Sequence, residues 1–229
     1  MDRGVFVGSP RTSASTVFRR QFLVFSKSWL PSDCVAARLC KSGNKIHNSR
    51  PVNRTHAILL RKTRLTESSL IVTWLSASHG RVKTVAKGVF RPKSRLAGVL
   101  DSLHLCEIQF SPARTGDLHS LREANLLEAF VNVRRDYPRL ALAAYGVELI
   151  ERSTEAEFPM PELFDLLQRL LRFLDANAGS QKALRHFESE LVRLLGVAQP
   201  GIPAEESLEA LLHRLPVNRG ELLSRLSAL

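Results

Sequence analysis

The hydrophobic pattern of this chain changes its period once, near Asn132. Before that point the apolar residues form short runs separated by turn residues, which is typical of a small β-barrel. The His79-Gly80 pair suits a hairpin turn between two of these runs. We expect five strands, at residues 55–65, 69–76, 81–87, 103–110 and 119–124. Five such strands are the number in an OB-fold, a Greek-key barrel that often binds nucleic acids.

After Asn132 the apolar residues recur three or four positions apart, which predicts helices. Asp136 and Pro138 are suited to the start of the first helix. A second helix should begin near the prolines at 159 and 161, and a third helix should span about 180–196. Two shorter amphipathic segments follow, at 207–215 and 219–229. The predicted fold class is therefore α+β, with an amino-terminal five-stranded OB-fold β-barrel followed by an α-helical bundle.

Charge divides the chain into three parts. Residues 1–53 hold nine Lys or Arg against two Asp, a balance of +7, and show no sustained period. We expect this extension to be largely disordered, or to precede the true start of the protein. Residues 54–132 form the expected barrel domain, and its first part, 54–100, holds ten basic residues against Glu67 alone. Residues 133–229 form the expected helical domain. A basic barrel joined to a more acidic remainder favours a nucleic-acid-binding module.

The strongest binding candidate is the segment 81–95, which contains no acidic residue. Basic and uncharged residues largely alternate in its first half, so Arg81, Lys83 and Lys87 should share one face of a strand. Gly88 then permits a change of direction, and Phe90 offers a ring for base stacking. Trp74 is a weaker stacking candidate, because it shares a strand face with apolar residues. The expected DNA-binding residues are Arg61, Lys62, Arg64, Arg81, Lys83, Lys87, Phe90, Arg91, Lys93 and Arg95. About six phosphate contacts on duplex DNA would give a log–log salt slope of roughly −5.

Catalytic and metal-binding patterns are missing from the sequence. The three cysteines have no zinc-binding spacing, and no nucleophile stands in a recognisable motif. A metal-dependent nuclease would need clustered carboxylates near the basic strands. An RNA-binding OB-fold protein would carry the same charge pattern and remains an alternative. No apolar run is long enough to span a membrane. The few unpaired cysteines favour a reducing, cytoplasmic setting.

Several short motifs resemble those of a known family. They are the Ala57–Arg61 run AILLR, the ESSLIVT run from Glu67, the HGR run from His79, the AKG run from Ala86 and, above all, the RPKSRL run from Arg91. Over about residues 55–198 the chain is similar to the RecO family of bacterial DNA repair and recombination mediators. Support in the second half comes from the PELF run at 161–164 and the LLG run at 194–196.

The resemblance implies a protein that binds single- and double-stranded DNA, anneals complementary strands and is not an enzyme. It also implies two partners, RecR and the acidic C-terminal tail of single-stranded DNA-binding protein (SSB), so that RecA can be loaded onto SSB-coated DNA. Such a protein is cytoplasmic and associated with the nucleoid. Many family members carry a four-cysteine zinc module, but residues 197–229 contain no cysteine. We therefore expect no metal and no cofactor.

An acidic tail with an apolar end needs a hydrophobic slot with basic residues at its rim. The helical domain offers basic residues beside apolar helix faces. The predicted partner-binding residues are Arg139, Leu142, Arg185, Leu191, Arg193 and Leu195.

Overall fold

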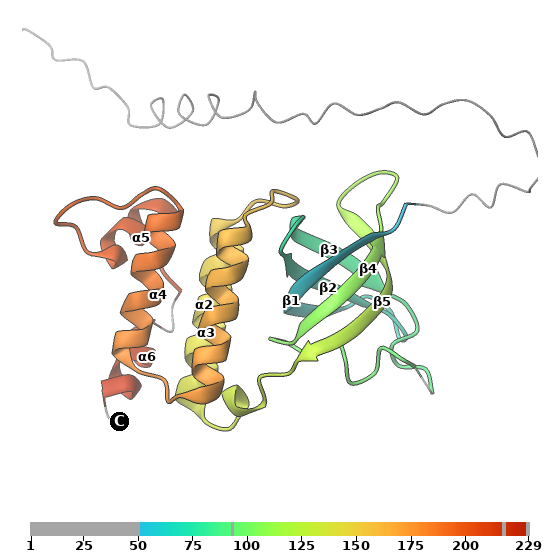
Figure 1. The fold of residues 1–229 in the computed structure, drawn as a ribbon, viewed down its shortest axis with the longest axis horizontal. Helices are drawn as coiled ribbons and strands as arrows, with labels where there is room; N and C mark the ends of the chain where they lie inside the picture. The colour runs from blue at the N-terminus through green and yellow to red at the C-terminus, as the bar shows by residue number, and fades with distance from the viewer. Residues whose placement is uncertain (1–50, 93, 217–218, 228–229) are drawn as a thin grey trace, which may run out of the picture. The chain divides into compact units, whose positions relative to one another are not determined.

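The computed structural model describes residues 51–92, 94–216 and 219–227. Two regions follow one another along this part of the chain, a β-barrel and a set of helices (Figure 1). The predictions for residues 1–50, and for Lys93, lie outside the described residues.

Five strands close into a barrel in the order β1-β2-β3-β5-β4. They are β1 (Asn53–Arg64), β2 (Leu70–Ser76), β3 (Gly80–Ala86), β4 (Leu105–Ser111) and β5 (Leu118–Glu128). All neighbours are antiparallel except β3 and β5, which pair in parallel. The predicted five-stranded OB-type barrel is therefore confirmed, with β5 ending four residues later than expected.

The helices begin with a short 3-10 turn, η1 (Val131–Arg134), and α2 (Tyr137–Ser153). The carboxylate of Asp136 accepts a hydrogen bond from the Arg139 amide at 2.9 Å, so the predicted N-cap is confirmed. The remaining helices are α3 (Pro161–Ala176), α4 (Gln181–Leu194), α5 (Ala204–Leu212) and α6 (Arg219–Ser227). The predicted helical half is present, and none of the described helices is long and apolar enough to cross a membrane.

Apolar side chains pack both inside the barrel and against its outer surface. Its interior is filled from every strand, and Trp74 lies there fully buried, donating its indole N–H to the Thr84 hydroxyl at 2.9 Å. A second core joins the outside of the barrel to the helices, with Ile58, Leu60 and Leu75 as barrel members. An irregularity in β1 between Leu59 and Arg61 shifts its register against β2. Four consecutive residues of β1, from 57 to 60, are buried because 57 and 59 face the barrel interior while 58 and 60 pack in the core shared with the helices.

The segment between α2 and α3 docks against β3. Ala156 forms a parallel bridge with Arg81, and the Glu157 amide donates to the Arg81 carbonyl at 2.9 Å. Gly80 has φ of +66°, and a Cβ there would lie 2.1 Å from the Phe158 carbonyl oxygen. Only glycine allows both the turn and this close approach. The docked segment fixes how the barrel meets α2.

A buried polar cluster secures the last helix. Arg219 donates to both carboxylate oxygens of Glu188, at 2.8 and 3.0 Å, and also pairs with Glu205. Tyr145 donates its hydroxyl to Glu188 at 2.5 Å. Burial and this contact with Glu188 raise the pKa of Tyr145. Helices α2, α4 and α6 are thus joined through the Glu188 carboxylate, and Arg219 links α5 to them through Glu205.

Candidate nucleic-acid interface

The strand register places several predicted residues side by side on the outside of the barrel. Arg61 of β1 pairs with Thr73 of β2, which pairs with Lys83 of β3, which pairs with Leu118 of β5. Paired residues point to the same side of a sheet. We call the row Arg61–Thr73–Lys83–Leu118 the outer face.

Strand β3 alternates as predicted. Arg81, Lys83 and Val85 are half-buried and point outward, whereas Val82, Thr84 and Ala86 are buried. Lys87 follows the strand and is exposed. The expected shared face is therefore present on the barrel surface.

Several outer-face cations already have partners in the protein. Lys83 pairs with Asp117 at 2.8 Å, and Arg61 lies 3.4 Å from Glu151 of α2. Hydrogen bonding from Lys83 lowers the pKa of Asp117. Arg81 donates to the Thr154 carbonyl at 3.0 Å. A phosphate that reached these groups would have to compete with existing contacts.

Lys62 is also engaged. It donates to Asp101 at 2.6 Å, and Arg134 pairs with the other oxygen of the same carboxylate. Burial alone would raise the pKa of Asp101, but hydrogen bonds from Lys62, Arg134 and the Ser102 amide lower it to about 2. Lys62 therefore helps to hold the loop before β4 against β1.

The loop after β3 has a different character. Gly88 takes φ of +68°, the Arg91 amide donates to its carbonyl at 3.2 Å, and the Arg91 side chain lies over it. The Val89 amide donates to the Ser68 carbonyl at 2.9 Å, which ties this loop to the β1–β2 turn. Residues 87–92 and 94–96 and Arg64 together form what we call the basic loop site.

Phe90 is the exposed aromatic residue of this site, with 56% of the residue accessible to solvent. The Arg64 guanidinium lies over its ring, 5.7 Å from the centroid. Arg91 and Arg95 are also exposed. Within the described part of the chain, none of the four cations Arg64, Lys87, Arg91 and Arg95 has an acidic partner.

The ten predicted DNA-binding residues therefore separate into two groups, with Lys93 outside the described residues. Four cations are held by contacts within the protein: Arg61, Lys62, Arg81 and Lys83. Five residues are available in the basic loop site: Arg64, Lys87, Phe90, Arg91 and Arg95. Sequence reasoning missed the carboxylates that hold Arg61, Lys62 and Lys83, because Asp101, Asp117 and Glu151 lie 34 to 90 positions away from their partners.

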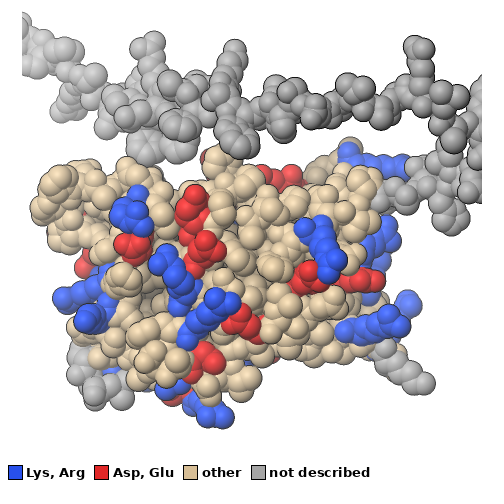
Figure 2. All heavy atoms as spheres, in the orientation of Figure 1, with Lys and Arg blue, Asp and Glu red and all other residues tan. Residues whose placement is uncertain are grey.

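The surface charge is accordingly mixed. Figure 2 shows one face of the molecule, on which many Lys and Arg side chains lie next to Asp or Glu. Arg172 with Glu128 and Arg54 with Glu107 are such pairs in and beside the barrel. The net charge of +11 thus overstates the number of cations that are free to bind a polyanion.

The structure buries most of the leucines of the partner slot predicted in the helical domain. Leu142 and Leu191 are fully buried, and Leu195 packs against the same core. Arg139 pairs with Asp136 and Arg193 with Glu190, while Arg185 is exposed. Leu142 lies in α2, which is apolar on nearly every side, and Leu191 lies on the buried face of α4, so both leucines serve packing.

A different groove lies between α3 and α4. It has a volume of about 500 Å³ and is mostly apolar, with Leu170, Phe173 and Phe187 in its lining. Arg169, Lys182 and His186 also line it. We call it the α3–α4 groove.

Metal ligands do not gather in the described residues. No group of three or more His, Cys, Asp or Glu there is placed to hold a metal ion. Cys106 is a buried free cysteine, and burial raises the pKa of its thiol to about 12.

The described residues form an OB-type barrel followed by a set of helices. A family model described as "Recombination protein O N terminal" matches residues 52–130, and one described as "Recombination protein O C terminal" matches residues 134–199. The chain belongs to the Recombination protein O (RecO) family of DNA repair proteins.

Curated relatives agree with this assignment. The chain is 35% identical over 143 residues to the DNA repair protein RecO of Geobacter metallireducens, covering 62% of this chain and 58% of the relative. It is 34% identical over 140 residues to that of Rhodopirellula baltica, covering 61% and 52%. It is 28% identical over 151 residues to that of Syntrophus aciditrophicus, covering 66% and 58%. The matches thus span little more than half the length of these relatives.

Proposed function

We propose that this protein is a recombination mediator in DNA repair. It binds single- and double-stranded DNA, anneals complementary strands and, with RecR, helps to load RecA onto SSB-coated DNA in the bacterial cytoplasm, at the nucleoid. It acts by binding and not by catalysis. Membership of the RecO family supports this role. The observation that carries the DNA contact is the basic loop site, where four cations and an exposed ring lie together without described acidic partners.

The proposed contact is made mainly to phosphates. Each cation of the basic loop site can neutralise one phosphate and release its counterion, so binding depends steeply on salt and little on sequence. Trp74 cannot stack on bases, because it is fully buried and hydrogen-bonded to Thr84. Phe90 is then the stacking ring of this site. Contacts to the phosphate backbone of the DNA leave most base edges free to pair with a second strand.

The α3–α4 groove is the proposed site for the acidic C-terminal tail of SSB. Its apolar floor suits an apolar chain end, and Arg169 and Lys182 suit carboxylates beside it. Phe173, a residue that is 42% exposed, gives the tail an apolar surface to cover. This groove replaces the slot predicted from sequence.

The decisive experiment is an annealing assay on complementary strands coated with SSB, with and without the acidic tail of that protein. We expect rapid annealing that depends on the tail and weakens with salt. Arg169→Glu with Lys182→Glu should lose the dependence on the tail, whereas Arg193→Glu, on the same α4, should keep it. Absence of annealing on both substrates would contradict the mediator role.

Two further comparisons separate the alternatives. Of two oligomers with matched sequence, the DNA should bind more tightly than the RNA. Tighter binding to the RNA would support an RNA-binding OB-fold protein. Labelled DNA incubated with Mg²⁺ should stay intact. Cleavage would show a nuclease and would contradict the proposal.

A further inference from the structure

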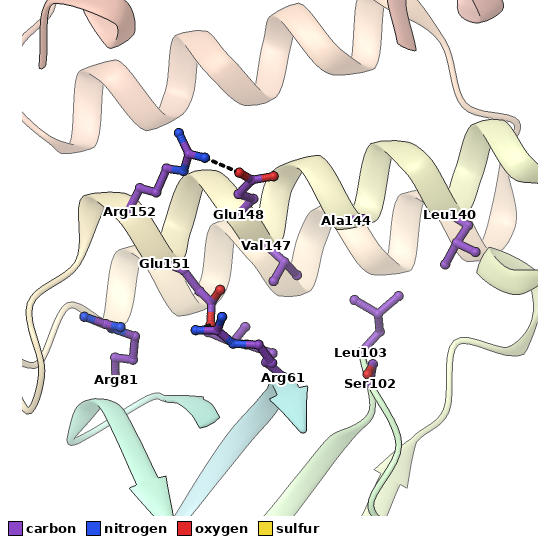
Figure 3. Close-up of a pocket in the computed structure, with 11 residues that line it drawn as sticks. Arg61, Arg81, Ser102, Leu103, Leu140, Ala144, Val147, Glu148, Glu151 and Arg152 are labelled. Atoms are coloured by element: carbon purple, nitrogen blue, oxygen red, sulfur yellow. Dashed lines mark hydrogen bonds and ion pairs between the residues drawn. The ribbon is translucent and has the colours of Figure 1, made fainter. Parts of the chain in front are cut away.

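A cleft lies where the barrel meets α2 (Figure 3). Its volume is about 620 Å³, within the range of roughly 300–1,000 Å³ that is usual for ligand sites. One wall comes from the barrel and its loop, the other from a single side of α2. The lining residues are Leu60, Arg61, Arg81, Ser102 and Leu103 from the barrel, and Leu140, Ala144, Val147, Glu148, Glu151 and Arg152 from the helix.

The polar groups of the cleft are incompletely paired. Arg152 pairs with Glu148 on its own helix, and Arg61 lies beside Glu151 (Figure 3). Arg81 uses one terminal nitrogen on the Thr154 carbonyl, but its buried Nε has no hydrogen-bond partner. The buried Oε1 of Glu151 also lacks a hydrogen bond, although Arg61 lies 3.4 Å away. Buried polar atoms are normally hydrogen-bonded, so the Arg81 Nε donor is left for a ligand, while Glu151 Oε1 has only its ion pair with Arg61.

The charges of the lining define the ligand further. Three guanidinium groups face two carboxylates, which leaves one positive charge. Apart from Ser102, the remaining lining is apolar, and Leu103 and Leu140 point toward one another across the cleft (Figure 3). The matching ligand carries one negative charge and a flat body with hydrogen-bonding groups at its edge. A nucleotide within a DNA strand has one charged phosphate and a base of this kind.

The cleft is continuous with the outer face through Arg61, which belongs to both. A strand that follows the row from Lys83 to Arg61 therefore arrives at the cleft. A base stacked and paired in a duplex cannot enter it, whereas a base of a single strand can turn into it.

We propose that this cleft is a nucleotide subsite specific for single strands. The phosphate lies on Arg81 and Arg61, the base lies against the exposed Leu140 and Ala144, and an amino group of the base donates to Glu151. This inference rests on the proposed DNA-binding function and adds to it a place where single strands are told from duplexes.

The test fills the cleft without changing its charge. Ala144 lies on the exposed surface of α2 and lines the cleft, so Ala144→Trp places an indole in the cleft at little cost to folding. Ala210→Trp, at an exposed position of α5 outside the lining, is the matched control. Fluorescence anisotropy would measure binding to oligodeoxycytidine, whose base carries an amino group, and to a duplex.

We expect Ala144→Trp to bind the single strand about tenfold more weakly, the size of one lost base contact, and to bind the duplex within about twofold of wild type. A second variant, Leu140→Gln, removes part of the apolar wall without adding bulk and should weaken the single strand alone. Circular dichroism of each variant, matching wild type, confirms the fold.

Two results would overturn the subsite. One is unchanged binding of both DNAs by Ala144→Trp, which would favour a peptide as the occupant. The other is an equal loss for single strand and duplex. If wild type itself bound neither DNA, the proposed function would fail first, so the two failures are distinguishable.

Discussion

Arginine serves opposite purposes in the two halves of this molecule. In the helical domain, Arg219 is buried and bonded to Glu188 and Glu205, and its contact with Glu188 raises its pKa. In the basic loop site, Arg91 and Arg95 are exposed and have no acidic partner among the described residues. The sequence shows the same residue type in both places. Burial and the nearest carboxylate decide whether it stabilises the fold or is available to a ligand.

The largest expected effect comes from the buried arginine. Arg219→Met would leave Glu188 buried without its countercharge and should lower the free energy of unfolding by about 3–5 kcal/mol. Urea denaturation measures this loss. Arg193→Met removes an exposed pair with Glu190 and should cost at most about 1 kcal/mol. Equal losses in the two variants would mean that the buried cluster is not what holds α6.

The loop arginines should show the reverse behaviour. Arg91→Gln with Arg95→Gln should weaken DNA binding about tenfold or more and reduce the log–log salt slope by about 2, because two phosphate contacts are lost. The free energy of unfolding should change by no more than about 0.5 kcal/mol. Arg193→Gln with Arg225→Gln is the control with equal charge removed from exposed helix pairs. If that control lost as much affinity, net charge and not position would determine binding.

Asp101 lies between these extremes, because its carboxylate is only partly exposed and holds Lys62 and Arg134. Its pKa is lowered to about 2, so its contribution to stability is present above the ordinary Asp pKa and is lost as the pH falls through about 2. NMR titration of the carboxyl carbon measures the pKa, and Asp101→Asn should flatten stability between about pH 4 and 2. An ordinary pKa in the folded protein would contradict this pairing.

The smallest effect is expected for the exposed ring. Phe90→Ala should weaken binding to single strands by about threefold, because phosphate contacts dominate the site. Anisotropy on single-stranded DNA measures it, with Arg91→Ala as the comparison. If Phe90→Ala abolished binding while Arg91→Ala left it intact, base stacking would be the main source of affinity.

The sequence predicted the local features well. The five strands, the alternation of β3 and the cap at Asp136 depend on residues close together in the chain, and all three are present. Contacts over long distances were missed. Nothing near Lys83 indicates that Asp117 would meet it, and no periodicity separates Leu142 from a surface leucine in a helix that is covered on nearly every side.

Hydrogen exchange with and without single-stranded DNA tests most directly the claim that the basic loop site contacts DNA. The account predicts that DNA slows amide exchange in residues 61–69 and 87–96, where the basic loop site lies, and leaves α5 unchanged. Slowed exchange confined to the helices, with no change in residues 87–96, would contradict it.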